Sequence, residues 1–282
     1  MIFYKTSSFG NDFIEIDESD LPARAADKCL LAREICDAHR AVGADGVVFY
    51  RNRGNEFDFQ IHNRDGGEAE LSGNGLAGLA AVLFQRRLAS SPLIIHTAIG
   101  KRRVELLARR GPVFQLNVEI GRPDFSNHNF FPFLKDKQDN YVIDGLEFYP
   151  VSVGNPHGVF LCRDRPDRKQ LAALWKKLEI HPMFPWRINV EFVFFSAAEH
   201  PINGTAALSP ASCQVFFYER GVGPTLASST GSAAVFAILR RLGKVHDRLV
   251  INCGPEKINV SWNRGIFIHN FTRLVCRGNY FG

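Results

Sequence analysis

The sequence has no apolar run of the length that a membrane span requires. A helix that crosses a bilayer takes about eighteen or more apolar residues, and no window of the 282-residue chain approaches this. The first residues, Met1 to Lys5, also lack the charged, apolar and small-residue zones of a secretory signal peptide. We therefore expect a cytoplasmic protein that does not engage a membrane.

The cysteines show no pattern of a metal site or of a disulfide framework. The chain contains no C-x-x-C pair and no cysteine at zinc-like spacing from a histidine. We expect reduced thiols, as in a cytoplasm, and no bound metal. The cysteines are Cys29, Cys36, Cys162, Cys213, Cys253 and Cys276.

Charge of either sign is not concentrated anywhere along the chain. The 34 Lys and Arg against 29 Asp and Glu give a net charge of +5, and the basic pairs are scattered. Without aromatic residues between them on one element, these pairs do not predict a nucleic-acid surface. The mild positive balance suits an anionic small substrate instead.

What the sequence does contain is an internal repeat. Ser72-Gly73-Asn74-Gly75 and Ser228-Ser229-Thr230-Gly231 each lead into an apolar, helix-favouring stretch, and they lie 156 positions apart. The same shift places Leu83 on Leu239. A period of that length indicates a duplicated domain rather than a solenoid.

Each repeat begins as a helix N-terminus is expected to begin. The serine hydroxyl can accept from an unpaired backbone N–H, and glycine allows close approach. The remaining N–H groups and the positive end of the helix dipole favour an anion at that point. We therefore interpret the two helix starts as anion cradles that face one substrate.

The order of expected elements is the same in both halves. Strands, a helix and further strands precede each cradle and its apolar helix, which is typical of a helix enclosed by its own sheet. Expected helices cover residues 24–39, 76–88, 168–178 and 232–242, the strand at 190–196 is expected before the second cradle, and residues 274–277 are expected to return as an edge strand.

The polar, proline-containing stretch 121–139 is the best boundary. We predict an N-terminal domain of residues 1–121, joined by 271–282, and a C-terminal domain of residues 122–270. The fold class is α/β, with two pseudo-symmetric domains, each a curved and mostly antiparallel sheet around a central helix, and an active-site cleft between them.

Amide side chains gather at the expected rim of that cleft. Asparagine offers donors and acceptors without charge, and one arginine can bind a carboxylate through two hydrogen bonds, so this set predicts an α-amino acid as ligand. The residues are Asn11, Asn63, Asn155, Asn189 and Arg220, with Glu219 beside the arginine.

Each of these residues also has a purely structural interpretation. Asn11, Asn63 and Asn155 lie in turns, where asparagine is common for backbone reasons alone. Ser72 and Ser228 can be plain helix caps, worth about 1 kcal/mol each. The placement of the whole set beside duplicated helix starts favours a ligand site.

Six segments together resemble diaminopimelate epimerase, in order and over nearly the whole chain. They are Phe9-Gly10-Asn11-Asp12-Phe13, Gly43-Ala44-Asp45-Gly46, Asn63 through Gly75, Gly154-Asn155-Pro156-His157, Asn189-Val190-Glu191-Phe192-Val193 and Tyr218-Glu219-Arg220-Gly221-Val222-Gly223. The resemblance implies a two-domain amino-acid epimerase of lysine biosynthesis that uses neither pyridoxal phosphate nor another cofactor. One residue per domain then removes or delivers the α-proton.

The resemblance also implies a role for each matching position. Ser72 and Ser228 occupy the reactive positions, with His157 and Glu219 near the reacting carbon. Substrate contacts fall to Asn11, Asn63, Gly73, Asn74, Asn155, Asn189, Arg220, Ser229 and Thr230, with Glu219 and Gly231 contributing. Whether the chain forms a homodimer is left open.

The departure from the family lies at the reactive positions. The family carries cysteine where this chain has Ser72 and Ser228, glycine at Ser229 and usually glutamate at Pro224. A thiol with a pKa of about 8.5 can become a thiolate at a helix start, whereas a serine hydroxyl needs a strong adjacent base. Serine is also the near-isosteric replacement for a deliberately disabled cysteine, so the origin of the pair is open.

Three functions follow from these observations. The first is an amino-acid epimerase whose serines are activated, with a diaminopimelate-like substrate. The second is another isomerisation, an elimination or a cyclisation at a more acidic C–H, with Glu219 or His157 as the base. The third is an amino-acid binder without catalysis.

Overall fold

The chain divides into two compact units. The computed structural model describes residues 1–22, 27–135, 138–143, 145–162, 167–194 and 211–281. One unit consists of Met1–Glu119 with His269–Gly282, and the other consists of Ile120–Ile268. Because the last segment returns to the first unit, that unit is built from both ends of the chain.

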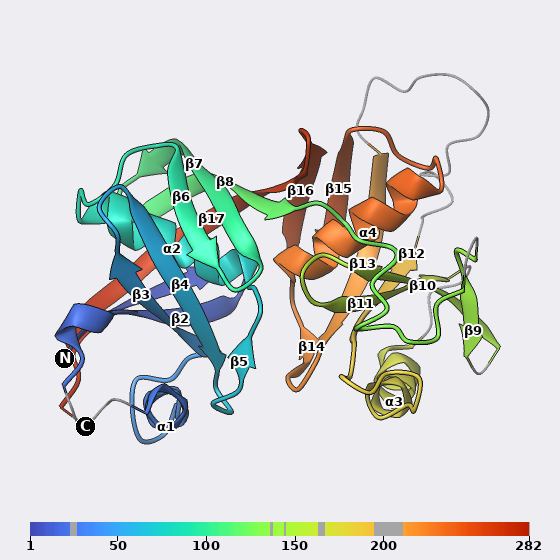
Figure 1. Cartoon of the computed structure of the whole chain (residues 1–282), viewed down its shortest axis with the longest axis horizontal. Helices are drawn as coiled ribbons and strands as arrows, with labels where there is room; N and C mark the ends of the chain where they lie inside the picture. The colour runs from blue at the N-terminus through green and yellow to red at the C-terminus, as the bar shows by residue number, and fades with distance from the viewer. Residues whose placement is uncertain (23–26, 136–137, 144, 163–166, 195–210, 282) are drawn as a thin grey trace. The chain divides into compact units, whose positions relative to one another are not determined.

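The strands of the first unit form a closed, barrel-like sheet (Figure 1). Successive neighbours are β1, β2, β3, β4, β6, β7, β8 and β17, and β17 pairs again with β1. The pairs β2–β3 and β4–β6 are parallel, and the other pairs with a resolved register are antiparallel. The strands are β1 (Ile2–Ser8), β2 (Asn11–Asp17), β3 (Gly46–Asn52), β4 (Glu56–Asn63), β5 (Glu68–Ala69), β6 (Leu93–Thr97), β7 (Gly100–Arg110), β8 (Val113–Gly121) and β17 (Ile266–Asn279).

The second unit repeats this order. Its neighbours are β9, β10, β11, β12, β13, β15 and β16, with β11–β12 and β13–β15 parallel and β14 paired to β13. The strands are β9 (Tyr141–Ile143), β10 (Leu146–Ser152), β11 (Pro156–Cys162), β12 (Asn189–Phe194), β13 (Ala211–Glu219), β14 (Gly223–Thr225), β15 (Arg248–Cys253) and β16 (Glu256–Trp262). Strands β10 to β16 thus correspond to β1 to β7.

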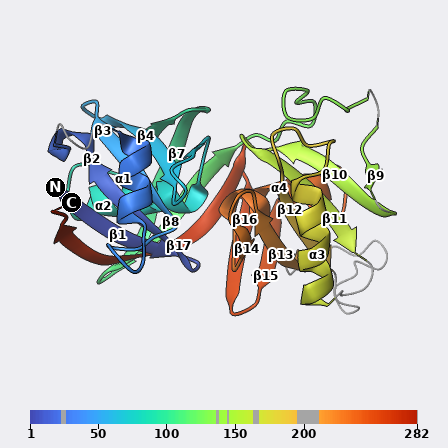
Figure 2. The same ribbon diagram turned by 90° about the horizontal axis from the view of Figure 1, so that it is seen from below.

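A central helix fills each sheet. Helix α2 (Gly73–Gln85) contacts β1, β2, β3 and β7, and helix α4 (Ser229–Arg241) contacts β10, β11, β12 and β16. All residues of α2 up to Phe84 and of α4 up to Leu239 are buried. These helices are apolar around their whole circumference because strands surround them (Figures 1 and 2).

A second helix lies outside each sheet. Helix α1 (Lys28–Ile35) and helix α3 (Arg168–Glu179) are amphipathic, and each buries one face (Figure 2). A short 3-10 helix (Glu18–Asp20) follows β2. In the aromatic core of the second unit, Trp175 of α3 stacks on Tyr218, with ring centroids 5.7 Å apart and an interplanar angle of 24°.

Helix α1 is shorter than the expected helix at residues 24–39. The Asp27 side chain accepts from the N–H of Leu30 and starts the helix, while residues 24–26 lie outside the described residues. After Ile35, the Asp37 side chain accepts from the N–H groups of His39 and Arg40. This local bonding competes with helix continuation and explains the early end.

Strand β17 differs from the expected edge strand at residues 274–277. It begins at Ile266 and lies between β1 and β8, so it completes the barrel. Its polar residues Asn270 and Thr272 point inward and are fully buried, whereas Phe271 is 40% exposed. The usual alternation is inverted here, and a search for inward apolar residues therefore misses the strand. The expected strand 190–196 is β12, and its last two residues lie outside the described residues.

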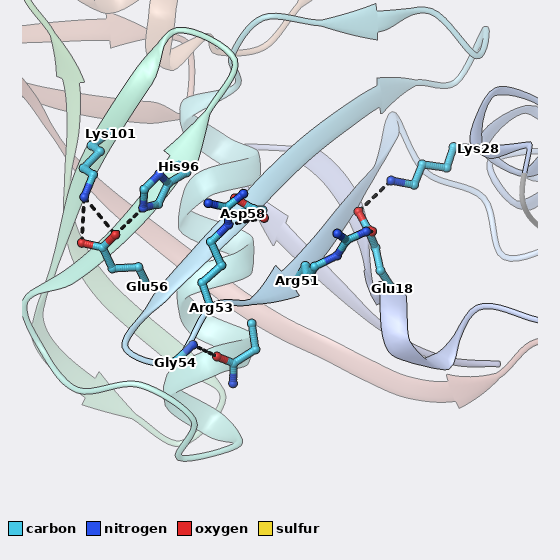
Figure 3. Close-up of polar contacts among 10 residues, drawn as sticks. Glu18, Lys28, Arg51, Arg53, Gly54, Glu56, Asp58, His96 and Lys101 are labelled. Carbon is cyan, nitrogen blue, oxygen red and sulfur yellow. Dashed lines mark hydrogen bonds and ion pairs between the residues drawn. The ribbon is translucent and has the colours of Figure 1, made fainter.

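Several ion pairs lie on the outside of the first barrel (Figure 3). Glu56 binds both His96 and Lys101, with 2.9 Å between the Glu56 and Lys101 charges. The Lys101 ammonium and His96 hold the pKa of Glu56 below its usual value. Exposed pairs of this kind contribute little to stability, and this cluster contains none of the predicted site residues. The other pairs are Glu18–Lys28, Glu18–Arg51 and Arg53–Asp58.

Candidate functional site

The two serines cap the central helices in the same conformation. Ser72 has φ −137° and ψ 120°, and Ser228 has φ −135° and ψ 125°. Each hydroxyl accepts from the N–H of the residue three positions later, Gly75 or Gly231, at 3.1 Å. Both hydroxyls therefore lie at the positive end of a buried helix.

In the first unit, the structure joins two of the predicted amides. Nδ2 of Asn74, in the first turn of α2, donates to Oδ1 of Asn11 at 2.9 Å. Gly73 is buried beside them at the helix start. Asn63 ends β4, where its backbone N–H and carbonyl bond Gly67 and Gly66 at 2.8 Å, as expected of a turn residue.

In the second unit, His157 lies between two partners and is fully buried. Its Nδ1 lies 2.7 Å from Oε1 of Glu191, and its Nε2 lies 2.8 Å from Oδ1 of Asn155. The Asn155 oxygen only accepts, so Nε2 is the donor in that bond, and Nδ1 faces the Glu191 carboxyl group. The imidazole is thus held in one orientation by Glu191.

The remaining predicted residues of the second unit lie around β12, the end of β13 and the start of α4. The Asn189 side chain donates to the Pro156 carbonyl at 2.9 Å and accepts from the Arg220 backbone N–H at 3.0 Å. Glu219 accepts from Thr225 at 2.9 Å. Asn189 therefore fixes the turn that carries Glu219 and Arg220.

Two further predicted residues, Ser229 and Thr230, lie buried in the first turn of α4. The Thr230 hydroxyl is 3.4 Å from that of Ser228. Ser228 thus lies among small hydroxyl side chains at the N-terminus of its helix.

Sequence reasoning missed two buried glutamates, one in each unit. Glu191 of β12 is 1% exposed, and Glu15 of β2 is fully buried. Each has one carboxyl oxygen without a partner among the described residues. The signal was present, because each glutamate interrupts a run of apolar strand residues.

The surroundings of Glu15 favour the neutral form of its carboxyl group over the charged form. Burial raises its pKa well above the usual value, against the hydrogen bond from Thr6, whose Oγ1 donates to Oε1 at 2.5 Å. The nearby charge of Asp12 raises the pKa further. Glu15 packs against Gly78 of α2, where a Cβ would overlap its carboxyl oxygen.

The cysteines are free thiols. Burial raises the pKa of Cys36 and of Cys253 to about 12, and that of Cys162 to about 11. These three thiols stay protonated at neutral pH, so they are poor nucleophiles.

Two classes of feature are missing from the described part of the chain. No group of three or more His, Cys, Asp or Glu residues there has the arrangement of a metal site. None of the helices described is long and apolar enough to cross a membrane.

Known proteins match this sequence over most of its length. The sequence profile of the family "Diaminopimelate epimerase" matches residues 3–125 and 149–265. A diaminopimelate epimerase of Methanocaldococcus jannaschii is 32% identical over 272 residues, covering 89% of this chain and 88% of the relative. One of Carboxydothermus hydrogenoformans is 32% identical over 291 residues and covers 100% of both chains.

A solved structure shares the fold. The probable proline racemase from Agrobacterium radiobacter K84 superimposes with a TM-score of 0.67 at 13% identity, covering 99% of this chain and 92% of that chain. The repeated barrel with its enclosed helix is therefore a known architecture. The family profile and the two relatives at 32% identity show that this chain belongs to the diaminopimelate epimerase family.

Proposed function

We propose that the protein is a cofactor-independent isomerase that inverts the α-carbon of an amino acid of the diaminopimelate class. The observation that carries this proposal is the pair of serine-capped helix starts, equal in φ and ψ to within 5° and 156 positions apart. A helix start stabilises negative charge, which is what a carboxylate gains when its α-proton leaves.

In this proposal Ser72 and Ser228 are the two proton-transfer groups, one from each copy of the repeat. Removal of the proton on one face and delivery on the other inverts the centre. The first-turn residues Gly73 and Thr230 address the carboxylate, where the developing enolate charge is stabilised by the helix ends.

The rest of the predicted set would hold the substrate. Asn11, Asn74 and Asn155 supply amide groups, and Arg220 suits a second carboxylate because its fork can bind both oxygens. Support comes from the hydrogen bonds that already fix the amides of Asn11 and Asn155. A substrate with two amino-acid heads uses both the helix starts and the arginine.

The serines set the expected rate. We infer that they take the positions of the family's cysteines, and a hydroxyl is a much weaker acid than a thiol. Both His157 ring nitrogens are engaged, by Glu191 and Asn155. Exchange at the α-carbon is therefore expected to be slow with serine and faster with cysteine.

Deuterium exchange tests the proposal. The protein is incubated with LL-diaminopimelate in deuterated water, and α-deuterium uptake and the meso product are measured by NMR and chiral chromatography. A Ser72→Cys/Ser228→Cys variant is expected to exchange faster, and a Ser72→Ala/Ser228→Ala variant is the matched control. Absence of exchange in both the wild type and the cysteine variant refutes epimerisation.

A second function is favoured by one observation. In the buried His157–Glu191 pair, 2.7 Å apart, the acid orients the imidazole, and Nε2 becomes available for proton transfer when a ligand replaces its contact with Asn155. Such a base serves isomerisation, elimination or cyclisation of a substrate whose C–H is more acidic than that of an amino acid. Loss of turnover in His157→Gln, with turnover retained in the double alanine variant, identifies this chemistry. Full turnover in His157→Gln excludes it.

A further inference from the structure

Six side chains of the first unit form one continuous run of hydrogen bonds. They come from β1, β17, α2, β2 and the loop before β3, and the run ends at a carboxylate. The links are Ser8 to Thr272 (2.7 Å), Thr272 to Asn270 (2.8 Å), Asn270 to Asn74 (3.0 Å), Asn74 to Asn11 (2.9 Å) and, as a longer contact, Asn11 to Asp45 (3.4 Å).

The run has one direction. Oδ2 of Asp45 already accepts from the Asp12 backbone at 3.0 Å, so it faces the nitrogen end of the Asn11 amide. The oxygen end of Asn11 then accepts from Asn74. An amide has one oxygen and one nitrogen end, so fixing one end fixes the next partner.

The same logic continues to the far end of the run. The Asn74 oxygen accepts from Nδ2 of Asn270, and the Asn270 oxygen accepts from the Thr272 hydroxyl. Thr272 has thereby used its proton, so Ser8 is the donor to Thr272. Each side chain in the run therefore donates a hydrogen bond to the next one in the direction of Asp45.

Burial locks this direction. Asn270 and Thr272 are fully buried, Ser8 is 1% exposed and Asn74 is 4% exposed. Reversal of one amide would bring two oxygens or two N–H groups together where water cannot compensate. In this part of β17 the inward residues are polar, and they supply Asn270 and Thr272 to this run.

We propose that Asn270 and Thr272 are positioning residues that fix which end of the Asn11 amide faces the ligand. They act through Asn74 and do not touch the substrate. Asn11 is half-buried, and its Nδ2 carries a second hydrogen besides the one directed at Asp45, so Asn11 addresses a ligand acceptor, namely a carboxylate oxygen. This assignment rests on the proposed amino-acid function of the site.

Asn270→Asp tests the direction because it changes one atom. While the introduced carboxyl group is protonated, it can still donate to Asn74 and accept from Thr272, so it reproduces the wild-type run. The ionised form only accepts, and the Asn74 amide must turn. A buried carboxyl group without a cation keeps its proton well above its usual pKa, so the switch is driven by raising the pH.

The readout is the ratio of variant to wild-type KM as a function of pH. For Asn270→Asp we expect a ratio near one at low pH and a rise of about tenfold at high pH, the effect of losing one hydrogen bond to the ligand, with kcat changing less. Thr272→Val is the matched control. It removes the donor to Asn270 but keeps the Asn270-to-Asn74 bond, so its ratio is expected to stay flat with pH.

A flat KM ratio in Asn270→Asp, or an equal rise in Thr272→Val, overturns the proposal. A second measurement needs no substrate. Neutron crystallography of the wild type is expected to show the deuterons of Asn74 Nδ2 directed at Asn11, and in Asn270→Asp at high pH directed at residue 270. The opposite wild-type orientation refutes the run, whereas failure of diaminopimelate turnover in the wild type refutes only the proposed function.

Discussion

The buried carboxyl group of Glu15 gives a sharp test of the electrostatics inside the first barrel. Burial raises its pKa well above the usual value of 4.5. At a pH between the pKa of Glu15 in the unfolded chain and its pKa in the native state, the native state holds a proton that the unfolded chain has released. The free energy of unfolding therefore falls as the pH rises through this window.

The magnitude follows from the proton count. One proton held only by the native state changes the free energy of unfolding by about 1.4 kcal/mol per pH unit. Glu15→Gln removes this titration and keeps the bond from Thr6, since the amide oxygen can accept. The variant is expected to gain about 1.4 kcal/mol relative to the wild type for each pH unit above about 5, until the native pKa is reached.

Urea denaturation at a series of pH values measures this difference. The N–H₂ group introduced by Glu15→Gln adds a constant cost but no pH dependence, so the slope alone carries the test. Exposed Glu68 provides the matched control, because Glu68→Gln removes a carboxyl group on the surface. A difference between Glu15→Gln and the wild type that does not grow as the pH rises above about 5 refutes the raised pKa of Glu15.

Three further substitutions test packing and helix capping in the two units. Gly78→Ala places a methyl group against the Glu15 carboxyl oxygen, and such overpacking costs about 1–3 kcal/mol of stability. This cost is expected to exceed the gain in helix propensity of about 1 kcal/mol, so thermal denaturation should show a lower midpoint than in the wild type. Phe148→Ala, at a fully buried aromatic position, is expected to cost about 3–5 kcal/mol in urea denaturation, and a loss below about 1 kcal/mol contradicts the packed core. Ser228→Ala removes the hydrogen bond to Gly231 and is expected to cost about 1 kcal/mol, whereas an unchanged midpoint shows that the cap contributes nothing.

Local patterns predicted the repeated parts of the fold well. The 156-residue shift of the serine motif carries α2, Gly73–Gln85, onto α4, Ser229–Arg241, residue for residue. Capping and the length of an apolar run depend on neighbouring residues, so both could be predicted from the sequence. The extent of α1 was predicted less well, because the Asp37 side chain bonds the following backbone and ends the helix.

The full extent of strand β17 was not predicted, for a different reason. Its inward residues Asn270 and Thr272 are polar, whereas the pattern that identifies a strand assumes an apolar interior. The buried acids Glu15 and Glu191 were overlooked for the same reason, since each interrupts an apolar strand and is unfavourable there without its partner. Only a neighbour from another strand makes such a residue stable.

The sequence by itself determined that the chain is a duplication with two serine-capped helix starts and a set of amides near them. The tertiary structure decided which of those amides are held and in which direction. Asn270 reaches Asn74 across 196 positions, and Glu191 orients His157 from a neighbouring parallel strand. Capping depends on residues three apart, whereas the orientation of a buried amide depends on partners that only the closed sheet brings together.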